Sequence, residues 1–189
     1  KSSTEKAMLI NEADRDIVEV KITSNNSVLE LKRDQDQWKI VKPIEDLADE
    51  SAASSFASSF ANQKVQETEK SGPAVDWKQY GFDSDKTKQI DLKSVTGKDY
   101  HLTVSGKNAF DGRYYIRMND ILLLGEIAWA SILAREQSTL RDKRLLRDSA
   151  EPSEVVIQSK GNKLKLTRVD GKWTGPANLK LDREKIDYY

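Results

Sequence analysis

The chain of 189 residues contains no cysteine and a single histidine, His101. Without cysteine it can form no disulfide, no thiolate zinc site and no thiol nucleophile. A Ser-His-Asp triad or a multi-histidine metal site would depend on His101, and no nucleophile or metal-ligand spacing surrounds it. His101 stands in an alternating segment, opposite in parity to Tyr100 and Leu102, so it is predicted to face solvent.

Long apolar runs and an excess of one charge are also missing. No run approaches the ~20 apolar residues of a membrane-spanning helix, since the longest, residues 121–124, is strand-sized. Lysine plus arginine and aspartate plus glutamate both number 31, so the net charge is zero. This balance argues against a general nucleic-acid-binding protein, for which a basic excess is typical.

Recognisable ligand-binding loops are absent as well. Gly97-Lys98 and Gly106-Lys107 lack the upstream glycine and the Ser or Thr of a phosphate-binding loop. Asp34 and Asp36 resemble the start of a calcium loop, but no glycine or distal glutamate follows at the required positions. With 31 acidic residues, spacing alone cannot select a catalytic carboxylate pair. The sequence therefore predicts no catalytic residue, no metal site and no cofactor, and a protein that is not an enzyme.

What the sequence does contain is regular hydrophobic alternation. It predicts three β-hairpins, formed by residues 17–24 with 28–33, 88–94 with 99–105, and 113–118 with 121–124. A short strand is predicted at 38–41, and helical spacing of apolar residues predicts helices at 46–65 and 126–139. Asp46 or Asp49 can cap the first helix. Hairpins imply antiparallel sheets.

Residues 19–38 and 154–173 align without a gap as an internal repeat. About one identity would be expected by chance at roughly 6% usage per residue type. Eight aligned positions carry the same residue in both segments. They are Glu19, Val20, Ile22, Ser24, Leu29, Leu31, Arg33 and Trp38 in the first, and Glu154, Val155, Ile157, Ser159, Leu164, Leu166, Arg168 and Trp173 in the second. We therefore expect an α+β fold of duplicated units, each an antiparallel β-hairpin and short strand followed by a helix, with the second copy truncated.

Three segments follow from this repeat. Residues 1–16 are expected to be an N-terminal segment following a removed anchor or signal, because the chain begins without methionine. Residues 17–149 would hold the first repeat unit and a middle α+β section, and residues 150–189 an incomplete second unit. Trp38 and Trp173 occupy equivalent positions and are predicted to form the structural core of each repeat, each indole covering the end of its hairpin.

Several motifs together carry a family resemblance. Trp38 and Pro43 precede an Asp-led helix, Tyr80-Gly81-Phe82 precedes a strand, Tyr114-Tyr115 lies in a hairpin, and residues 140–146 and 171–173 read LRDKRLL and GKW. This set resembles the domain-of-unknown-function 4340 family of bacterial envelope proteins. The resemblance implies an N-terminal membrane anchor and a folded part outside the cytoplasm. For some members it also implies genes near ABC-type transporter components of the gliding-motility-associated kind. It implies no catalytic or ligand-binding residues.

Exposed aromatic and basic residues provide a candidate interaction surface. Trp77 lies in a polar stretch near Tyr80, and only one of two adjacent strand tyrosines can point inward. A basic run follows the second predicted helix; it is either a solvated helix end or a contact for anionic lipid or an acidic partner. The candidate residues are Trp77, Tyr80, Arg113, Tyr115, Arg141, Arg144 and Arg147.

Taken with the resemblance, these observations favour a non-enzymatic, membrane-tethered interaction or accessory module of the bacterial cell envelope, associated with an ABC-type transport system. The expected partner is an envelope protein such as a transporter subunit, and no nucleic-acid partner is expected. The alternative is an extracytoplasmic small-molecule or glycan-binding domain, which would require an aromatic-lined cleft.

Overall fold

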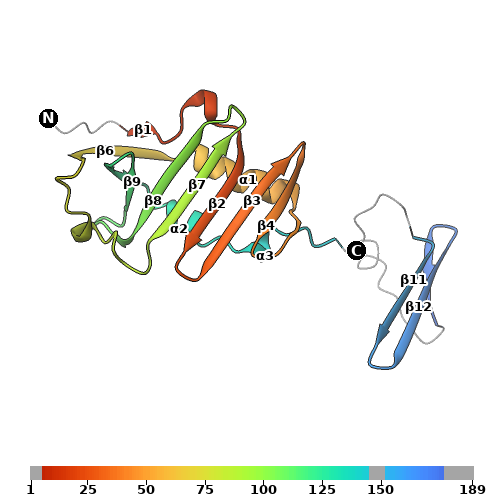
Figure 1. Cartoon of the computed structure of the whole chain (residues 1–189). Helices are drawn as coiled ribbons and strands as arrows, with labels where there is room; N and C mark the ends of the chain where they lie inside the picture. Colours follow the sequence, from red (N-terminus) through yellow and green to blue (C-terminus); the bar gives the residue numbers. More distant parts are fainter. Residues whose placement is uncertain (1–5, 145–151, 177–189) are drawn as a thin grey trace. The chain divides into compact units, whose positions relative to one another are not determined.

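The computed structural model describes residues 6–144 and 152–176. These residues form two compact units, one within Lys1–Asp142 and the other within Lys143–Tyr189. Both units are built mainly from antiparallel β-strands (Figure 1). No helix among the described residues has the length and apolar content needed to cross a membrane.

The first unit contains a ten-stranded sheet in the order β1-β6-β10-β9-β8-β7-β2-β3-β4-β5. Its strands are β1 (Lys6–Met8), β2 (Ile17–Ser24), β3 (Ser27–Asp34), β4 (Gln37–Lys42), β5 (Asp46–Leu47), β6 (Lys64–Ser71), β7 (Lys88–Ser94), β8 (Asp99–Asn108), β9 (Tyr114–Met118) and β10 (Ile121–Gly125). The helices are α1 (Glu50–Ala61), α2 (Trp129–Leu133) and α3 (Gln137–Leu140), with 3₁₀ turns η1 (Glu12–Asp14) and η2 (Trp77–Tyr80).

The three predicted hairpins are confirmed as β2–β3, β7–β8 and β9–β10. The turn between β9 and β10 shows why the sequence signal was reliable there. Asn119 and Asp120 have φ of 49° and 58°, the conformation of the type I′ turn that matches strand twist. Asparagine and aspartate tolerate this conformation better than other non-glycine residues.

The predicted α+β fold of duplicated hairpin–helix units is wrong. The strands β2, β3 and β4 do not form a self-contained unit, because β2 also pairs along its length with β7. Residues 17–47 and 64–125 therefore share one sheet, and α1 covers this shared sheet. Pairing between strands distant in sequence is a tertiary event that side-chain periodicity does not report.

Strand β6 was missed, and the first helix was predicted too long. The helix begins at the Asp49 cap, whose side chain accepts the Ala52 N–H at 2.8 Å, and it ends at Ala61. In β6 only Val65 is apolar, so no alternation marks the strand. Backbone hydrogen bonds hold β6 in the sheet, with β1 on one side and β10 on the other. Gln66 lies opposite Lys6 of β1 and opposite Leu124 of β10.

The predicted helix at 126–139 is broken into α2 and α3. Its apolar positions Trp129, Ile132 and Leu140 are buried as the helical spacing suggested. Glu136, however, has an extended backbone, with φ of −101° and ψ of 149°. The break lets two short helices pack separately near α1, where the Trp129 ring meets Phe60 at 6.0 Å between centroids.

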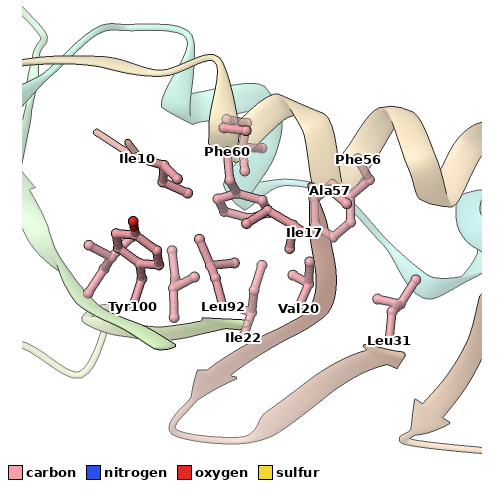
Figure 2. Close-up of a cluster of buried hydrophobic side chains, with 14 of the residues drawn as sticks. Ile10, Ile17, Val20, Ile22, Leu31, Phe56, Ala57, Phe60, Leu92 and Tyr100 are labelled. Atoms are coloured by element: carbon pink, nitrogen blue, oxygen red, sulfur yellow. The ribbon is translucent and has the colours of Figure 1, made fainter. Parts of the chain in front are cut away.

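The core lies between α1 and one face of the sheet (Figure 2). Alternate residues of β2 and β7, including Val20, Ile22 and Leu92, point to this face. The helix presents Phe56 and Phe60, whose rings meet edge to face at 5.3 Å. The smaller residues of the buried helix face, Ala53, Ala57 and Ala61, leave room for close approach to the strands.

The second unit is a three-stranded sheet of β11 (Glu154–Ser159), β12 (Asn162–Val169) and β13 (Lys172–Thr174). Its register matches that of the aligned segment: Val155 opposes Leu166 as Val20 opposes Leu31, and Trp173 opposes Arg168 as Trp38 opposes Arg33. The environments differ. Trp38 is 1% exposed, whereas Trp173 is only half-buried and Leu166 is the one buried apolar residue described in this unit.

Candidate functional site

The turn η2 places two aromatic residues of the predicted surface. Asp76 caps it by accepting the Lys78 N–H at 3.2 Å, and Gly81 ends it in the left-handed conformation with φ of 78°. A Cβ at position 81 would lie 2.5 Å from the Cβ of Lys107, so glycine is required for space as well as for conformation. This explains the glycine of the Tyr80-Gly81-Phe82 motif.

Hydrogen bonds fasten η2 to strand β8. The Ser105 hydroxyl donates to the Tyr80 carbonyl oxygen and accepts the Lys107 N–H at 2.8 Å. The Lys107 ammonium donates to the Gln79 carbonyl oxygen at 3.1 Å. Because the C-terminal half of the turn is held in this way, the backbone that carries Tyr80 has a fixed position on the sheet.

These rings lie on the sheet face opposite α2. In β9, Ile116 is fully buried and touches the position where a Gly125 side chain would stand, beside Trp129 of α2. Tyr115 and Arg117 have the opposite parity and therefore face the other side. There the rings of Tyr80 and Tyr115 meet edge to face, with centroids 5.0 Å apart.

A cation lies against each side of this group. The Arg117 guanidinium stands 4.3 Å from the centre of the Trp77 ring and pairs with Asp120. The Lys70 ammonium is 5.0 Å from the centre of the Tyr80 ring and contacts its hydroxyl. We call the set Lys70, Trp77, Tyr80, Phe82, Tyr115 and Arg117 the aromatic cluster; Phe82 packs on Trp77 at 5.3 Å.

The cluster has one buried anchor and a partly exposed rim. Tyr80 is 9% exposed, while Trp77, Tyr115 and Arg117 are half-buried and Lys70 is exposed. Such a surface combines rigid rings with charge-assisted donors. It can contact another macromolecule, but nothing in it resembles a nucleophile paired with a base.

The structure brings together part of the predicted surface. Trp77, Tyr80 and Tyr115 are in the cluster. Arg113 immediately precedes β9 and has the same parity as Tyr115, so it faces the same side of the sheet. Arg113 donates to the Gln66 side-chain oxygen and to Asp111, each at 2.8 Å. The backbone N–H of Arg113, and then its side chain, hold the pKa of Asp111 below its ordinary value.

Of the predicted basic run, Arg141 lies outside the cluster. Arg141 pairs with Asp46, and its backbone bridges to Ala48 beside α1. Arg144 is exposed and belongs to the second unit, and Arg147 lies outside the described residues.

Sequence reasoning did not include Arg117, Lys70 or Phe82 in the predicted surface. Arg117 could have been found, because it follows Tyr115 by two positions in a predicted strand and so shares its face. Lys70 could not, since it lies on β6, which carries no strand pattern.

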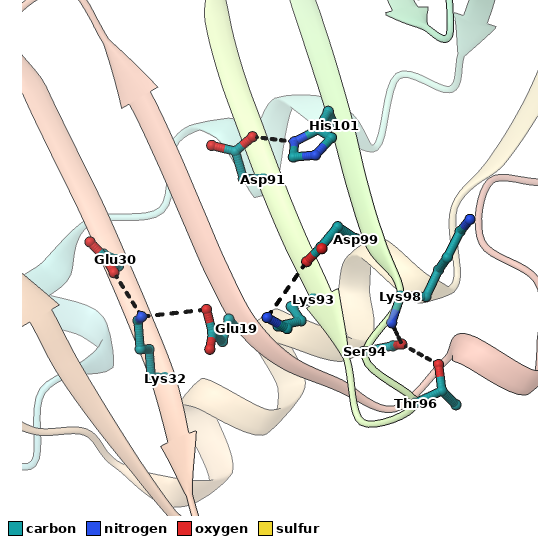
Figure 3. Close-up of polar contacts among 10 residues, drawn as sticks. All are labelled: Glu19, Glu30, Lys32, Asp91, Lys93, Ser94, Thr96, Lys98, Asp99 and His101. Atoms are coloured by element: carbon teal, nitrogen blue, oxygen red, sulfur yellow. Dashed lines mark hydrogen bonds and ion pairs between the residues drawn. The ribbon is translucent and has the colours of Figure 1, made fainter.

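The same sheet face continues as a charged ladder across β3, β2, β7 and β8 (Figure 3). One row reads Lys32, Glu19, Lys93 and Asp99, and the next reads Glu30, Lys21, Asp91 and His101. Signs alternate along each row when His101 is protonated. His101 is exposed as predicted, with its Nδ1 2.8 Å from an Asp91 oxygen.

Among residues 6–144 and 152–176, no three His, Asp or Glu side chains gather closely enough to hold a metal ion. The family model of a domain of unknown function, DUF4340, matches residues 38–189. No curated protein and no solved structure matches the chain.

Proposed function

Since the chain belongs to the DUF4340 family, we propose that it is a non-enzymatic interaction module of the bacterial cell envelope, held at the membrane by an N-terminal anchor. In this proposal it serves as an accessory of an ABC-type transport system. Its partner is a protein subunit of that system, and the aromatic cluster is the surface that meets it.

One observation carries the choice of surface: the guanidinium of Arg117 stacked on a half-buried Trp77, beside the Tyr80–Tyr115 ring pair. Tryptophan, tyrosine and arginine are the residue types enriched at the centre of protein interfaces. Trp77 and Tyr80 belong to the η2 turn, which hydrogen bonds attach to β8, so ordering their rings on binding would cost little side-chain entropy.

The charged ladder supports the same choice by contrast. Its lysines and carboxylates already compensate one another, as in the pairs of Lys32 with Glu19 and Glu30, each at 3.4 Å. A partner covering them would have to desolvate these charges, with little gain in return. The alternation of sign also provides no continuous basic track for a nucleic acid.

The test is crosslinking and co-purification of the full-length, anchored protein from its native membrane, with partners identified by mass spectrometry. Wild-type protein should recover a transporter subunit, and Trp77→Ala and Arg117→Ala should each reduce that recovery at least several-fold. Lys93→Ala is the matched control on the same sheet face and should recover the subunit as wild type does.

Recovery of no reproducible partner, or equal recovery with all variants, would contradict the proposal. A screen of glycans and metabolites against Trp77→Ala would then test the small-molecule or glycan-binding alternative, in which the same half-buried rings would contact the ligand.

A further inference from the structure

A pocket of about 300 Å³ lies on the helix side of the sheet, where the end of α2 meets β7 and β8. This volume is at the small end of the range for ligand pockets. Leu133 and Ala134 form its helix wall, Val104 forms part of its floor, and Asn108 and Tyr114 line it from β8 and β9. The pocket thus has an apolar side and a polar side.

The polar side is cationic. Lys86 and Lys88 both line the pocket, and none of the described residues that line it is acidic. The half-buried Lys88 ammonium donates to the Leu133 carbonyl oxygen at 2.6 Å, which uses one of its three N–H donors. The Lys86 ammonium has no hydrogen-bond or ion-pair partner among the described residues. Of the described residues that line the pocket, two are therefore lysines and none carries a carboxylate.

Local backbone geometry fixes Lys86 at the pocket edge. A Cβ at Gly106 would lie 2.5 Å from the Ser84 Oγ and 2.9 Å from the Lys86 Cβ. Glycine at 106 lets the turn before β7 close onto β8. Within that turn the Lys86 N–H donates to the Ser84 hydroxyl at 3.2 Å, so the position of Lys86 is set by the fold.

We propose that this pocket binds a small organic anion, a carboxylate or a phosphate that carries a short apolar group. Lys86 and Lys88 hold the anionic head, and the apolar group lies against Leu133, Ala134 and Val104. The pocket is on the helix side of the sheet and the aromatic cluster on the other, so this inference does not depend on the proposed protein interface.

Amide NMR titration of the full chain tests the inference with four probes. Butyrate and butyl phosphate carry the same apolar chain on the two candidate heads, butyramide lacks the charge, and inorganic phosphate lacks the chain. We expect saturable shifts at the amides of Gly106 and Ala134 with butyrate or butyl phosphate. Butyramide and inorganic phosphate should each bind about tenfold more weakly.

Two variants locate the binding, and one serves as the control. Lys86→Met removes an exposed charge without touching the core and should weaken binding about tenfold. Ala134→Leu fills the pocket from its exposed rim, leaves both lysines in place, and should abolish binding. Lys93→Met, in the charged ladder, should bind as wild type does. Folding of each variant is read from the same spectra.

The inference is overturned if neither anion gives saturable shifts, if butyramide binds as well as butyrate, or if Lys86→Met and Ala134→Leu leave the affinity unchanged. Inorganic phosphate binding as tightly as butyl phosphate would overturn the apolar half of the proposal.

Discussion

At the scale of single residues, Asp14 holds the N-terminal segment to the β7–β8 hairpin. Its carboxylate accepts hydrogen bonds from the Thr96 hydroxyl and the Tyr100 hydroxyl, both at 2.6 Å. These two bonds, that of Thr96 first, lower the pKa of Asp14. Burial, and then the Asp14 carboxylate, raise the pKa of Tyr100. The contact joins residues far apart in sequence, and it favours the ionised carboxylate.

This contact predicts a dependence of stability on pH. Because the folded pKa of Asp14 is below its ordinary value of 3.8, the stabilisation is complete above that value and is lost as the pH falls through the folded pKa. Asp14→Asn should therefore unfold at lower denaturant concentration than wild type at pH 7, and the difference should shrink towards pH 3. Denaturant titrations across this range measure it; a difference independent of pH would contradict the assignment.

Gly81 and Gly97 form a matched pair for testing the Tyr-Gly-Phe turn. Both have positive φ, 78° and 85°, but a Cβ at Gly97 meets nothing within 4 Å. Gly97→Ala should cost about 1 kcal/mol, the conformational penalty alone. Gly81→Ala should cost about 2–4 kcal/mol, because the new Cβ also overlaps Lys107. The loss in the free energy of unfolding is measured for each variant. Equal losses would show that the turn at Gly81 does not pack closely against β8.

At the scale of elements, the exposed face of β3, β2, β7 and β8 is ordered by charge. Glu19 lies between Lys32 and Lys93 in the sheet, and it is the main cause of the raised pKa of Lys32. The stabilisation that charged Lys32 gives to the folded state is complete below the ordinary lysine pKa of 10.5 and is lost as the pH rises through the folded pKa. Across physiological pH Lys32 is therefore charged.

Reversing one charge should make this row repulsive. Glu19→Lys would place three lysines side by side and should lower the free energy of unfolding by about 1 kcal/mol at low salt. The loss should shrink at about 1 M salt, where the screening length is roughly 3 Å. Glu19→Gln, which removes the attraction without adding repulsion, should cost less. A loss unaffected by salt would point to packing instead of charge.

At the scale of the molecule, the two units differ in how much apolar surface they bury. In the first unit the core spans α1 and most of the sheet, including fully buried Trp38, Ile90 and Ile116. In the second unit Val156 and Ile157 are 44% and 49% exposed. A three-stranded sheet with so little burial is marginal by itself.

Native-state hydrogen exchange should separate the two units. Amides of β2 and β7 should exchange only by global unfolding, whereas amides of β11 and β12 should exchange through opening that costs far less free energy. Protection factors at Val20 and Leu92 should exceed those at Val155 and Leu166 by at least about 100-fold. Equal protection in β12 and β7 would show that the second unit is stabilised by something its own residues do not supply.

The sequence by itself determined the hairpins, because alternation and turn chemistry are local. It also offered Asp49 as one of two caps for the first helix, and it predicted the exposure of His101 and placed Trp77 and Tyr115 in a candidate surface that the structure shows to be partly exposed. The match of residues 19–38 with 154–173 corresponds to the same strand register in both sheets. The hairpins, the helix cap and the exposure of His101 each depend on residues within one hairpin or one turn.

Only the tertiary structure decided how these pieces combine. The pairing of β2 with β7, the insertion of the polar β6 between β1 and β10, and the division of the second helix all depend on neighbours distant in sequence. The same holds for Arg117 meeting Trp77 and for the two lysines that line the pocket at the end of α2. Backbone hydrogen bonds between strands do not depend on side-chain pattern, so the sequence carries no periodic signal for them, and the sites built on such pairing appear only in the folded chain.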